Sequence, residues 1–220
     1  MKPLVLPGVY APQDDTALLA GVLSDEPLAP DALVLDVGTG SGALALVAAR
    51  RGARVTAVDV SRRAVYAARI NAWRAGLRIR ALRGNLFTPV RGEAFDLVLA
   101  NPPYVPTPDG HREPRGRARA WDAGHDGRLI LDRICEQAPA LLRPGGVLLL
   151  VHSVLSGPER TLEQLSGAGL TAEVTDRRWV AFGPVLRERR SWLRERGLLA
   201  ADSAAGDKEE LVVIRAVRQP

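Results

Sequence analysis

The amino-acid sequence predicts an α/β fold with a doubly wound parallel sheet, and three observations carry this prediction. Short, nearly continuous apolar runs recur along the chain, helical patterns separate them, and a glycine-rich segment joins the first run to a helix. The apolar runs occupy residues 32–37, 54–60, 95–100 and 146–153. Such runs are typical of strands that are buried on both faces. Regular alternation of strand and helix then predicts a doubly wound layer.

The elements that connect these strands follow from local patterns. We expect residues 1–30 to form an N-terminal entry segment and a first helix. Further helices are predicted over residues 41–51, 61–75 and 127–142. Ser61 supplies an N-cap for the second of these helices, and the sequence R-P-G-G closes the third. The weaker, alternating run at 77–83 predicts a more exposed strand.

The chain departs from this simple alternation after residue 153. We expect a helix at 158–166, a strand at 170–180, an arginine-rich helix at 184–199 and a final strand at 210–217. We expect residues 182–210 to form an insertion before the last strand, relative to the family described below, and Trp179 and Trp192 to pack against its helix. Residues 1–220 are predicted to form a single domain.

Composition limits the class of protein without deciding it. The net charge of +5 comes almost entirely from arginine, because Lys2 and Lys208 are the only lysines, and this balance permits contact with RNA or DNA. The single cysteine, Cys135, has no companions at metal-ligand spacing, so we predict a core thiol and no metal site. Since no apolar run approaches the roughly 18 residues of a membrane span, we expect a cytoplasmic protein without membrane contact.

The glycine-rich segment D-V-G-T-G-S-G, residues 36–42, directly follows the first strand. Glycines there allow positive φ and let a ligand approach the backbone, and we expect the amides of the following helix to point toward that ligand. The spacing G-x-G-x-G differs from the G-x-G-x-x-G of dinucleotide enzymes, and no lysine follows for a triphosphate. The segment therefore favours either a nucleoside without a pyrophosphate or a purely structural turn.

Two further strand ends favour the nucleoside. Asp59 lies near the end of the second strand, where its carboxylate can accept both hydroxyls of a ribose. Asn85 follows the third strand and can accept from an adenine amino group, while Leu86 or Phe87 packs against the ring. Each feature has a simpler alternative, because aspartate is a common N-cap and Gly-Asn a common turn.

The fourth strand ends in N-P-P-Y, residues 101–104, at the edge where open α/β sheets bind ligands. Pro102 and Pro103 restrict φ and remove two backbone donors, which leaves the Asn101 side-chain carbonyl and the Pro102 carbonyl as acceptors. Two acceptors that hold both N–H bonds of a planar NH2 group turn its lone pair toward an electrophile, and Tyr104 can stack on the plane. A methyl on the sulfonium of S-adenosylmethionine suits that electrophile; a rigid turn with a buried tyrosine is the alternative.

Taken in order, these segments resemble the class I S-adenosylmethionine-dependent methyltransferases, and within them the HemK-like glutamine N5-methyltransferases. The matching segments are V-Y-A-P-Q-D-D-T-A-L-L, D-V-G-T-G-S-G, A-V-D-V-S, G-N-L-F, N-P-P-Y-V and A-W-D-A-G-H-D-G-R-L-I-L-D-R-I, and they cover most of the chain up to about residue 155. The last of them, residues 120–134, separates this family from amino-methyltransferases of nucleic acids that share N-P-P-Y.

The resemblance implies a Rossmann-like, mostly parallel seven-stranded sheet whose last strand is antiparallel. It implies that Asn101, Pro102, Pro103 and Tyr104 form the catalytic clamp on the substrate amide, and it implies no metal. The cofactor, S-adenosyl-L-methionine with S-adenosyl-L-homocysteine as product, would be bound by Thr16, Asp36, Gly38, Thr39, Gly40, Gly42, Asp59, Val60, Asn85, Leu86 and Asn101. Family members commonly carry aspartate at position 85, so asparagine is a departure there.

The resemblance also implies a substrate. The chain is similar to the short archaeal and eukaryotic type, which lacks an N-terminal domain and methylates the Gly-Gly-Gln loop of a class 1 translation release factor. Some members need a small zinc-binding activator subunit. Two alternatives remain open at this stage: an N6-adenine or other exocyclic-amino methyltransferase acting on RNA or DNA, and a non-catalytic methyltransferase-like subunit.

Overall fold

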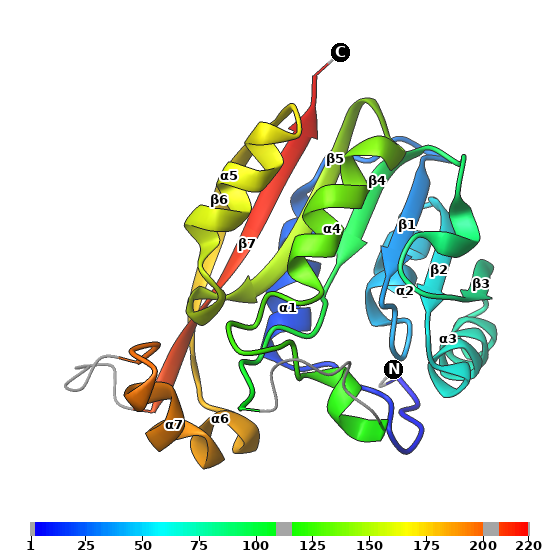
Figure 1. The fold of residues 1–220 in the computed structure, drawn as a ribbon. Helices are drawn as coiled ribbons and strands as arrows, with labels where there is room; N and C mark the ends of the chain where they lie inside the picture. Colours follow the sequence, from blue (N-terminus) through cyan, green and yellow to red (C-terminus); the bar gives the residue numbers. More distant parts are fainter. Residues whose placement is uncertain (1–2, 109–115, 200–206, 220) are drawn as a thin grey trace.

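The centre of the molecule is a seven-stranded sheet with the strand order β3-β2-β1-β4-β5-β7-β6 (Figure 1). The structure is a computed structural model, and it describes residues 3–108, 116–199 and 207–219. The strands are β1 (Leu33–Val37), β2 (Arg54–Asp59), β3 (Ile79–Arg83), β4 (Phe95–Ala100), β5 (Leu142–Ser153), β6 (Leu170–Ala181) and β7 (Lys208–Arg218).

The pairing of these strands confirms the predicted fold class. The strands β3, β2, β1, β4 and β5 pair in parallel, whereas β7, the last strand of the chain, runs antiparallel to β5 and to β6. The predicted strands at 32–37, 54–60, 77–83, 95–100, 170–180 and 210–217 all lie within two residues of the observed bounds.

Helices cover both faces of the sheet. They are α1 (Asp14–Asp25), α2 (Ala43–Arg50), α3 (Arg62–Arg74), α4 (Leu131–Gln137), α5 (Pro158–Gly167), α6 (Pro184–Glu188) and α7 (Arg190–Glu195). Short 3-10 helices are η1 (Thr88–Val90), η2 (Gly116–Ala120), η3 (Ala138–Leu141) and η4 (Val154–Ser156). Helices α4 and α5 contact each other in front of the sheet in Figure 1, and α1 and α2 contact each other behind it.

The central strands are apolar on both faces because both faces are covered. Neighbouring residues on β1 and β4, such as Val34 and Leu35 or Val98 and Leu99, are all fully buried although their side chains point to opposite faces. Burying each such side chain stabilises the fold by about 1.5–3 kcal/mol. The parallel register sets Val37 beside Ala100 on β4, so the loops that follow these strands leave the sheet at one edge.

Two predicted helices differ from the observed ones. The helix predicted over 127–142 is only α4 followed by η3, because Pro139 cannot donate to a carbonyl one turn earlier. The R-P-G-G sequence consequently belongs to the start of β5 rather than to a helix end. The helix predicted over 184–199 is divided into α6 and α7, and Arg189 lies at the break with φ −90° and ψ 2°.

The segment between β6 and β7 has a small apolar cluster of its own, formed by Phe182, Leu186 and Leu193. Trp192 packs against this cluster as predicted. The prediction for Trp179 is wrong, because that side chain is 57% exposed on β6. In the described part of the chain, no helix combines the length and the apolar character that crossing a membrane requires.

Candidate active site

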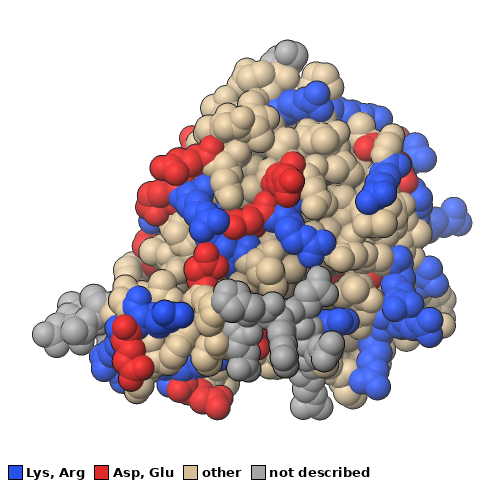
Figure 2. All heavy atoms as spheres, viewed as in Figure 1, with Lys and Arg blue, Asp and Glu red and all other residues tan. Residues whose placement is uncertain are grey.

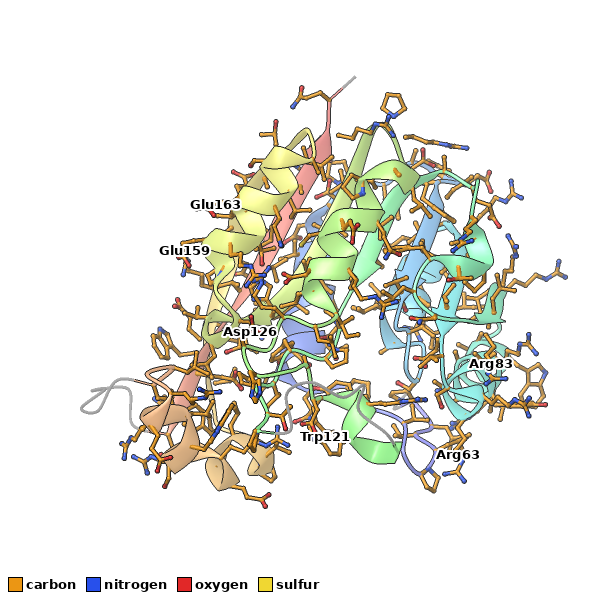
Figure 3. All side chains as sticks on the ribbon, viewed as in Figure 1. Arg63, Arg83, Trp121, Asp126, Glu159 and Glu163 are labelled. Carbon is orange, nitrogen blue, oxygen red and sulfur yellow. The ribbon has the colours of Figure 1, made fainter. Side chains whose placement is uncertain are left out.

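A cavity of about 460 Å³ opens at the edge of the sheet where the parallel strands end. It is lined by the loops that follow β1, β2, β3 and β4, by the entry segment before α1, and by the chain between η2 and α4. Figure 3 places Trp121, which lines the cavity, at this edge below α4. A volume of this size lies in the range of small-molecule sites.

The cavity brings together nearly all of the residues predicted as a site. Its lining includes Thr16, Asp36, Gly38, Thr39, Gly40, Asp59, Val60, Asn85, Leu86, Asn101, Pro102, Pro103 and Tyr104. Gly42 is the one predicted residue outside the lining. Its φ is +85°, and a Cβ there would lie 3.0 Å from the Cα of Ala68, so Gly42 lets α2 approach α3.

Asp36 organises the glycine-rich loop from beneath. Its buried carboxylate accepts hydrogen bonds from Thr39 Oγ1 at 2.6 Å and from the Ala45 amide at 3.1 Å. Burial raises the pKa of Asp36 to about 6, and the two hydrogen bonds partly oppose that rise. Asp36 therefore ties the loop to the first turn of α2.

Three backbone amides of this loop are used inside the protein. The amides of Gly38 and Thr39 both donate to the Val58 carbonyl, at 2.8 and 3.0 Å, and the Gly40 amide donates to Asp59 Oδ2 at 2.9 Å. Since these donors are already used inside the protein, they cannot also hold a phosphate. The arrangement suits a nucleoside that lies on the loop rather than an anion cradled by it.

Asp59 joins the loop to the end of β2. Its Oδ1 accepts from the Ser61 amide at 2.8 Å, while Oδ2 accepts from Gly40. Burial raises the pKa of Asp59, and these backbone hydrogen bonds oppose the rise. Each carboxylate oxygen has a second lone pair, so the group can still accept from a ligand hydroxyl in the cavity.

The loop after β3 closes another side of the cavity. Leu86 has φ +46°, a left-handed conformation that costs a branched residue about 1–3 kcal/mol and that is often found at functional sites. Asn85 Oδ1 accepts from Arg133 Nη2 of α4 at 3.2 Å. Of the two side chains that we considered for packing against a base, Leu86 lines the cavity and Phe87 lies in the core.

The Asn101 amide is oriented by α1. Its Nδ2 donates to Thr16 Oγ1 at 3.1 Å, which leaves Oδ1 as the acceptor of the same side chain. Thr16 Oγ1 in turn donates to Asp15 Oδ1 at 3.1 Å. The orientation of the asparagine therefore depends on a residue that lies 85 positions earlier in the chain.

Asp15 is a site residue that sequence reasoning missed. Its buried carboxylate also accepts from the hydroxyls of Tyr10 at 2.7 Å and Tyr104 at 3.2 Å. Burial, followed by the nearby Asp15 charge, raises the pKa of both tyrosines above the ordinary value, so both remain neutral donors. No sequence signal separates Asp15 from Asp14, because acidic residues are common in the first turn of any helix.

The backbone carbonyl of Tyr104 is also held in place. Ser156 Oγ donates to the Tyr104 carbonyl at 2.9 Å, and Gly127 lies directly against that carbonyl with φ +74°. Arg128, which is buried, fixes the adjoining segment through its ion pair with Asp132 at 2.7 Å. No sequence motif includes Ser156, so its role could not be predicted, whereas Gly127 and Arg128 lie inside the matched segment 120–134.

Glu209 of β7 is close enough to Tyr10 and Tyr104 for its charge to raise the pKa of both. It is buried, its Oε2 has no hydrogen-bond partner among the described residues, and burial raises its pKa to about 7. Ser153 opposes this rise by hydrogen bonding, and the Asp15 charge adds to it. Within the described residues, no cluster of three or more His, Cys, Asp and Glu side chains is placed to hold a metal ion.

Comparisons with known proteins show the family and the fold of this chain. The family model for the methyltransferase small domain matches residues 4–112. A chain of the Mtq2–Trm112 complex of E. cuniculi, described as methylating the translation termination factor eRF1, has the same fold, with a TM-score of 0.67 and 23% identity over 96% of this chain and 99% of that one. The fold is that of the class I S-adenosylmethionine-dependent methyltransferases.

Curated relatives narrow the family. A putative protein N5-glutamine methyltransferase of Methanocaldococcus jannaschii is 36% identical over 177 residues, which cover 80% of this chain and 88% of the relative. The release factor glutamine methyltransferase of Gloeobacter violaceus is 40% identical over 171 residues, 73% of this chain but only 59% of that enzyme. The chain belongs to the HemK-like protein glutamine N5-methyltransferase family.

The close contact at Gly127 provides a first test. In Gly127→Ala, the added Cβ would overlap the Tyr104 carbonyl and lie 2.5 Å from Ser156 Oγ, so Tyr104 must move. We expect kcat/KM for methyl transfer to fall about 100-fold, the order of loss that a displacement of about 1 Å causes. Gly169→Ala is the matched control, since Gly169 has φ +84° but no atom within 4 Å of an added Cβ. Equal activities of the two variants would contradict the positioning of Tyr104 by Gly127.

The buried Glu209 predicts a pH-dependent stability. Because its folded pKa of about 7 lies above the ordinary 4.5, the protonated form favours folding below pH 4.5, and this contribution is lost as the pH rises through 7. Glu209→Gln removes the buried charge, so at pH 8 it should raise the free energy of unfolding by about 2 kcal/mol, with little gain at pH 4. Denaturant unfolding at both pH values measures this difference. Glu210→Gln, which loses a pair with Arg177, is the control and should show no gain. A Glu209→Gln gain that is the same at both pH values would refute the prediction.

Proposed function

We propose that the chain transfers the methyl group of S-adenosylmethionine to the side-chain amide nitrogen, N5, of a glutamine in a protein, the Gly-Gly-Gln loop of a class 1 release factor. Family membership supports the amide, and the names of several relatives are those of release factor glutamine methyltransferases. The chain spans 88% of the archaeal relative but about three fifths of the bacterial enzymes. The release factor is therefore a proposal drawn from those names.

The cofactor half of the cavity fits the proposed donor. In this proposal, Asp59 accepts the ribose hydroxyls, Asn85 and Leu86 contact the adenine, and Thr16 with the loop at 38–40 contacts the methionine part. The polar groups present suit a nucleoside with an amino-acid tail, because the amides of Gly38, Thr39 and Gly40 are used inside the protein and do not bind a phosphate. When bound, S-adenosylmethionine supplies an electrophilic methyl group on a sulfonium.

The orientation of Asn101 is the observation that carries the proposal. Because its Nδ2 is taken by Thr16, Oδ1 is the end available to an incoming N–H, and the Pro102 carbonyl offers a second acceptor beside it. An amide nitrogen is a weak nucleophile, since its lone pair is delocalised into the carbonyl. Two acceptors that hold both N–H bonds turn the lone pair toward the methyl group and stabilise the positive charge that develops on nitrogen.

The other clamp residues restrict motion in this scheme. Pro102 and Pro103 limit φ, so the carbonyls do not need to reorganise when the substrate arrives. Tyr104 is held at two points, because its hydroxyl donates to Asp15 and its backbone carbonyl accepts from Ser156. We propose that its ring stacks against the planar amide. Methyl transfer then needs no general base before the rate-limiting step, because the methylated nitrogen loses its proton readily.

We also propose a small activator subunit and a cytoplasmic location. The fold neighbour from E. cuniculi is described as a complex with Trm112, and our chain leaves strand β3 at a sheet edge with Trp73 of α3 81% exposed beside it. Full activity of the purified chain without any second protein would contradict the activator.

The cytoplasmic location follows from the proposed substrate, because a protein that acts on a translation factor would meet that factor in the cytoplasm.

The substrate is tested directly by offering labelled S-adenosylmethionine with a class 1 release factor, with total RNA and with DNA. Nucleic acid is included because Arg62, Arg83, Arg119 and Arg133 line the cavity, and Figure 2 shows basic side chains gathered toward the α3 and β3 side. We expect label in the release factor alone, lost when its Gly-Gly-Gln glutamine is replaced. Label in RNA or DNA but none in the factor would overturn the proposal in favour of a nucleobase methyltransferase.

The clamp predicts a separation between binding and turnover. Asn101→Ala should lose about 2.7–4 kcal/mol of transition-state stabilisation, the cost of deleting one preset polar contact, while S-adenosylhomocysteine binds within about twofold of the wild type. Asp59→Asn should show the opposite pattern, with weaker cofactor binding by about tenfold and a smaller effect on kcat at saturation. Calorimetry with S-adenosylhomocysteine measures cofactor affinity, and single-turnover kinetics measure the rate of methyl transfer. Unchanged turnover in Asn101→Ala would refute the clamp.

A further inference from the structure

We infer that the segment between β6 and β7 holds the substrate side of the cavity in position, and that Arg189 is the positioning residue through which it acts. We call this segment, whose described residues are 182–199 and 207, the C-terminal insertion. The inference rests on the proposed function, because it assigns the substrate side of the cavity to the clamp. It gives a role to an arginine-rich segment that neither the fold nor the cofactor half requires.

One wall of the cavity is a short backbone pairing next to the clamp. The Val105 amide donates to the Trp121 carbonyl at 2.8 Å, and the Ala123 amide donates to the Val105 carbonyl at 3.0 Å. The Thr107 amide extends this pairing through the Gly124 carbonyl at 2.8 Å. The chain that leaves N-P-P-Y is thus fastened to the segment 121–124, and both parts contribute to the cavity lining.

Arg189 joins the two sides of this pairing. Its Nη1 lies 2.6 Å from Asp122 Oδ1 and also donates to the Pro106 carbonyl at 2.9 Å. Both charged side chains are largely buried, with 18% of Arg189 and 12% of Asp122 exposed. Removing either partner would leave the other charge buried and uncompensated, which is costly.

The break between α6 and α7 puts Arg189 within reach of this wall. The backbone of Arg189 leaves the helical conformation, and each flanking helix contributes one leucine, Leu186 or Leu193, to the buried cluster with Phe182. Val105, the residue after the clamp tyrosine, packs against the same cluster. Apolar packing and one guanidinium therefore connect the insertion to the chain immediately after Tyr104. Figure 1 shows α6 and α7 at the end of the sheet where β4 finishes.

The position of these contacts predicts which kinetic term depends on Arg189. Apart from Asn101, the expected cofactor contacts come from α1 and from β1, β2, β3 and the loops after them, whereas Arg189 touches only the wall at residues 106 and 122 among the contacts described above. If this wall becomes more mobile, binding of the protein substrate should weaken, whereas the cofactor-binding part of the cavity should not change. The KM for the release factor should therefore change more than kcat, and cofactor affinity should not change.

The test compares Arg189→Ala with Arg190→Ala. Arg190 is the next residue, and its ion pair with Asp207 at 2.9 Å lies at the surface with 39% and 48% of the side chains exposed, so its loss should matter little. For Arg189→Ala we expect kcat/KM for the release factor to fall by about ten- to a hundredfold, mostly through KM. S-adenosylhomocysteine affinity should stay within about twofold of the wild type in both variants. Arg189→Lys should recover part of the loss, since it keeps the charge but not the guanidinium geometry.

Hydrogen exchange provides a readout that is independent of activity. The amides of Val105 and Ala123 should exchange faster in Arg189→Ala than in the wild type or Arg190→Ala, while the Gly38 and Thr39 amides stay protected. If the wild type binds cofactor but does not methylate the factor, the proposed function fails, and the exchange pattern still decides whether Arg189 holds the wall. Equal exchange and equal kinetics in the two variants would overturn the inference. So would a variant that loses protection and cofactor affinity throughout, because that would show a general loss of structure.

Discussion

The carboxylate of Asp15 is the point at which the separate parts of the site are joined. It accepts hydrogen bonds from Tyr10 in the entry segment, from Thr16 beside it and from Tyr104 after β4. Hydrogen bonds to a charged acceptor contribute about 1.5–3 kcal/mol each when they are buried. The same carboxylate also orients the Asn101 amide indirectly, because Thr16 Oγ1 donates to Asp15 and accepts from Asn101 Nδ2. Asp15 therefore joins the clamp tyrosine to helix α1, in addition to the hydrogen bond between Thr16 and Asn101.

The cavity has two halves that are stabilised in different ways. The cofactor half is built from backbone, since the glycine-rich loop satisfies its amides on Val58 and Asp59 and is held from below by Asp36. The clamp half depends on side chains that come from distant parts of the chain, namely α1, η4 and the C-terminal insertion. In the function that we propose, the methyl donor therefore binds on a loop built from backbone, while the position of the acceptor nitrogen depends on tertiary contacts.

Most of the fold could be predicted from the sequence because the strands are buried on both faces and are therefore continuous apolar runs. The positions of Asp36, Asp59, Asn85 and Asn101 could also be predicted, since parallel strands end at one edge and each of these residues lies at the end of a strand or just after it. Four features could not be predicted: the internal use of the loop amides, the role of Asp15, the break at Arg189, and the packing of Gly42 on Ala68. Each of these depends on a partner that is distant in the sequence or on backbone geometry that several residue patterns permit.

The central claim is that Asn101 and Pro102 present two preset carbonyl acceptors to a planar amide. A crystal structure of the chain with S-adenosylhomocysteine and a Gly-Gly-Gln peptide measures this directly. The account predicts that the glutamine amide nitrogen lies within hydrogen-bonding distance of Asn101 Oδ1 and the Pro102 carbonyl, with Asn101 Nδ2 still on Thr16. A glutamine held elsewhere in the cavity, or an Asn101 side chain that turns its NH2 group toward the substrate, would contradict it.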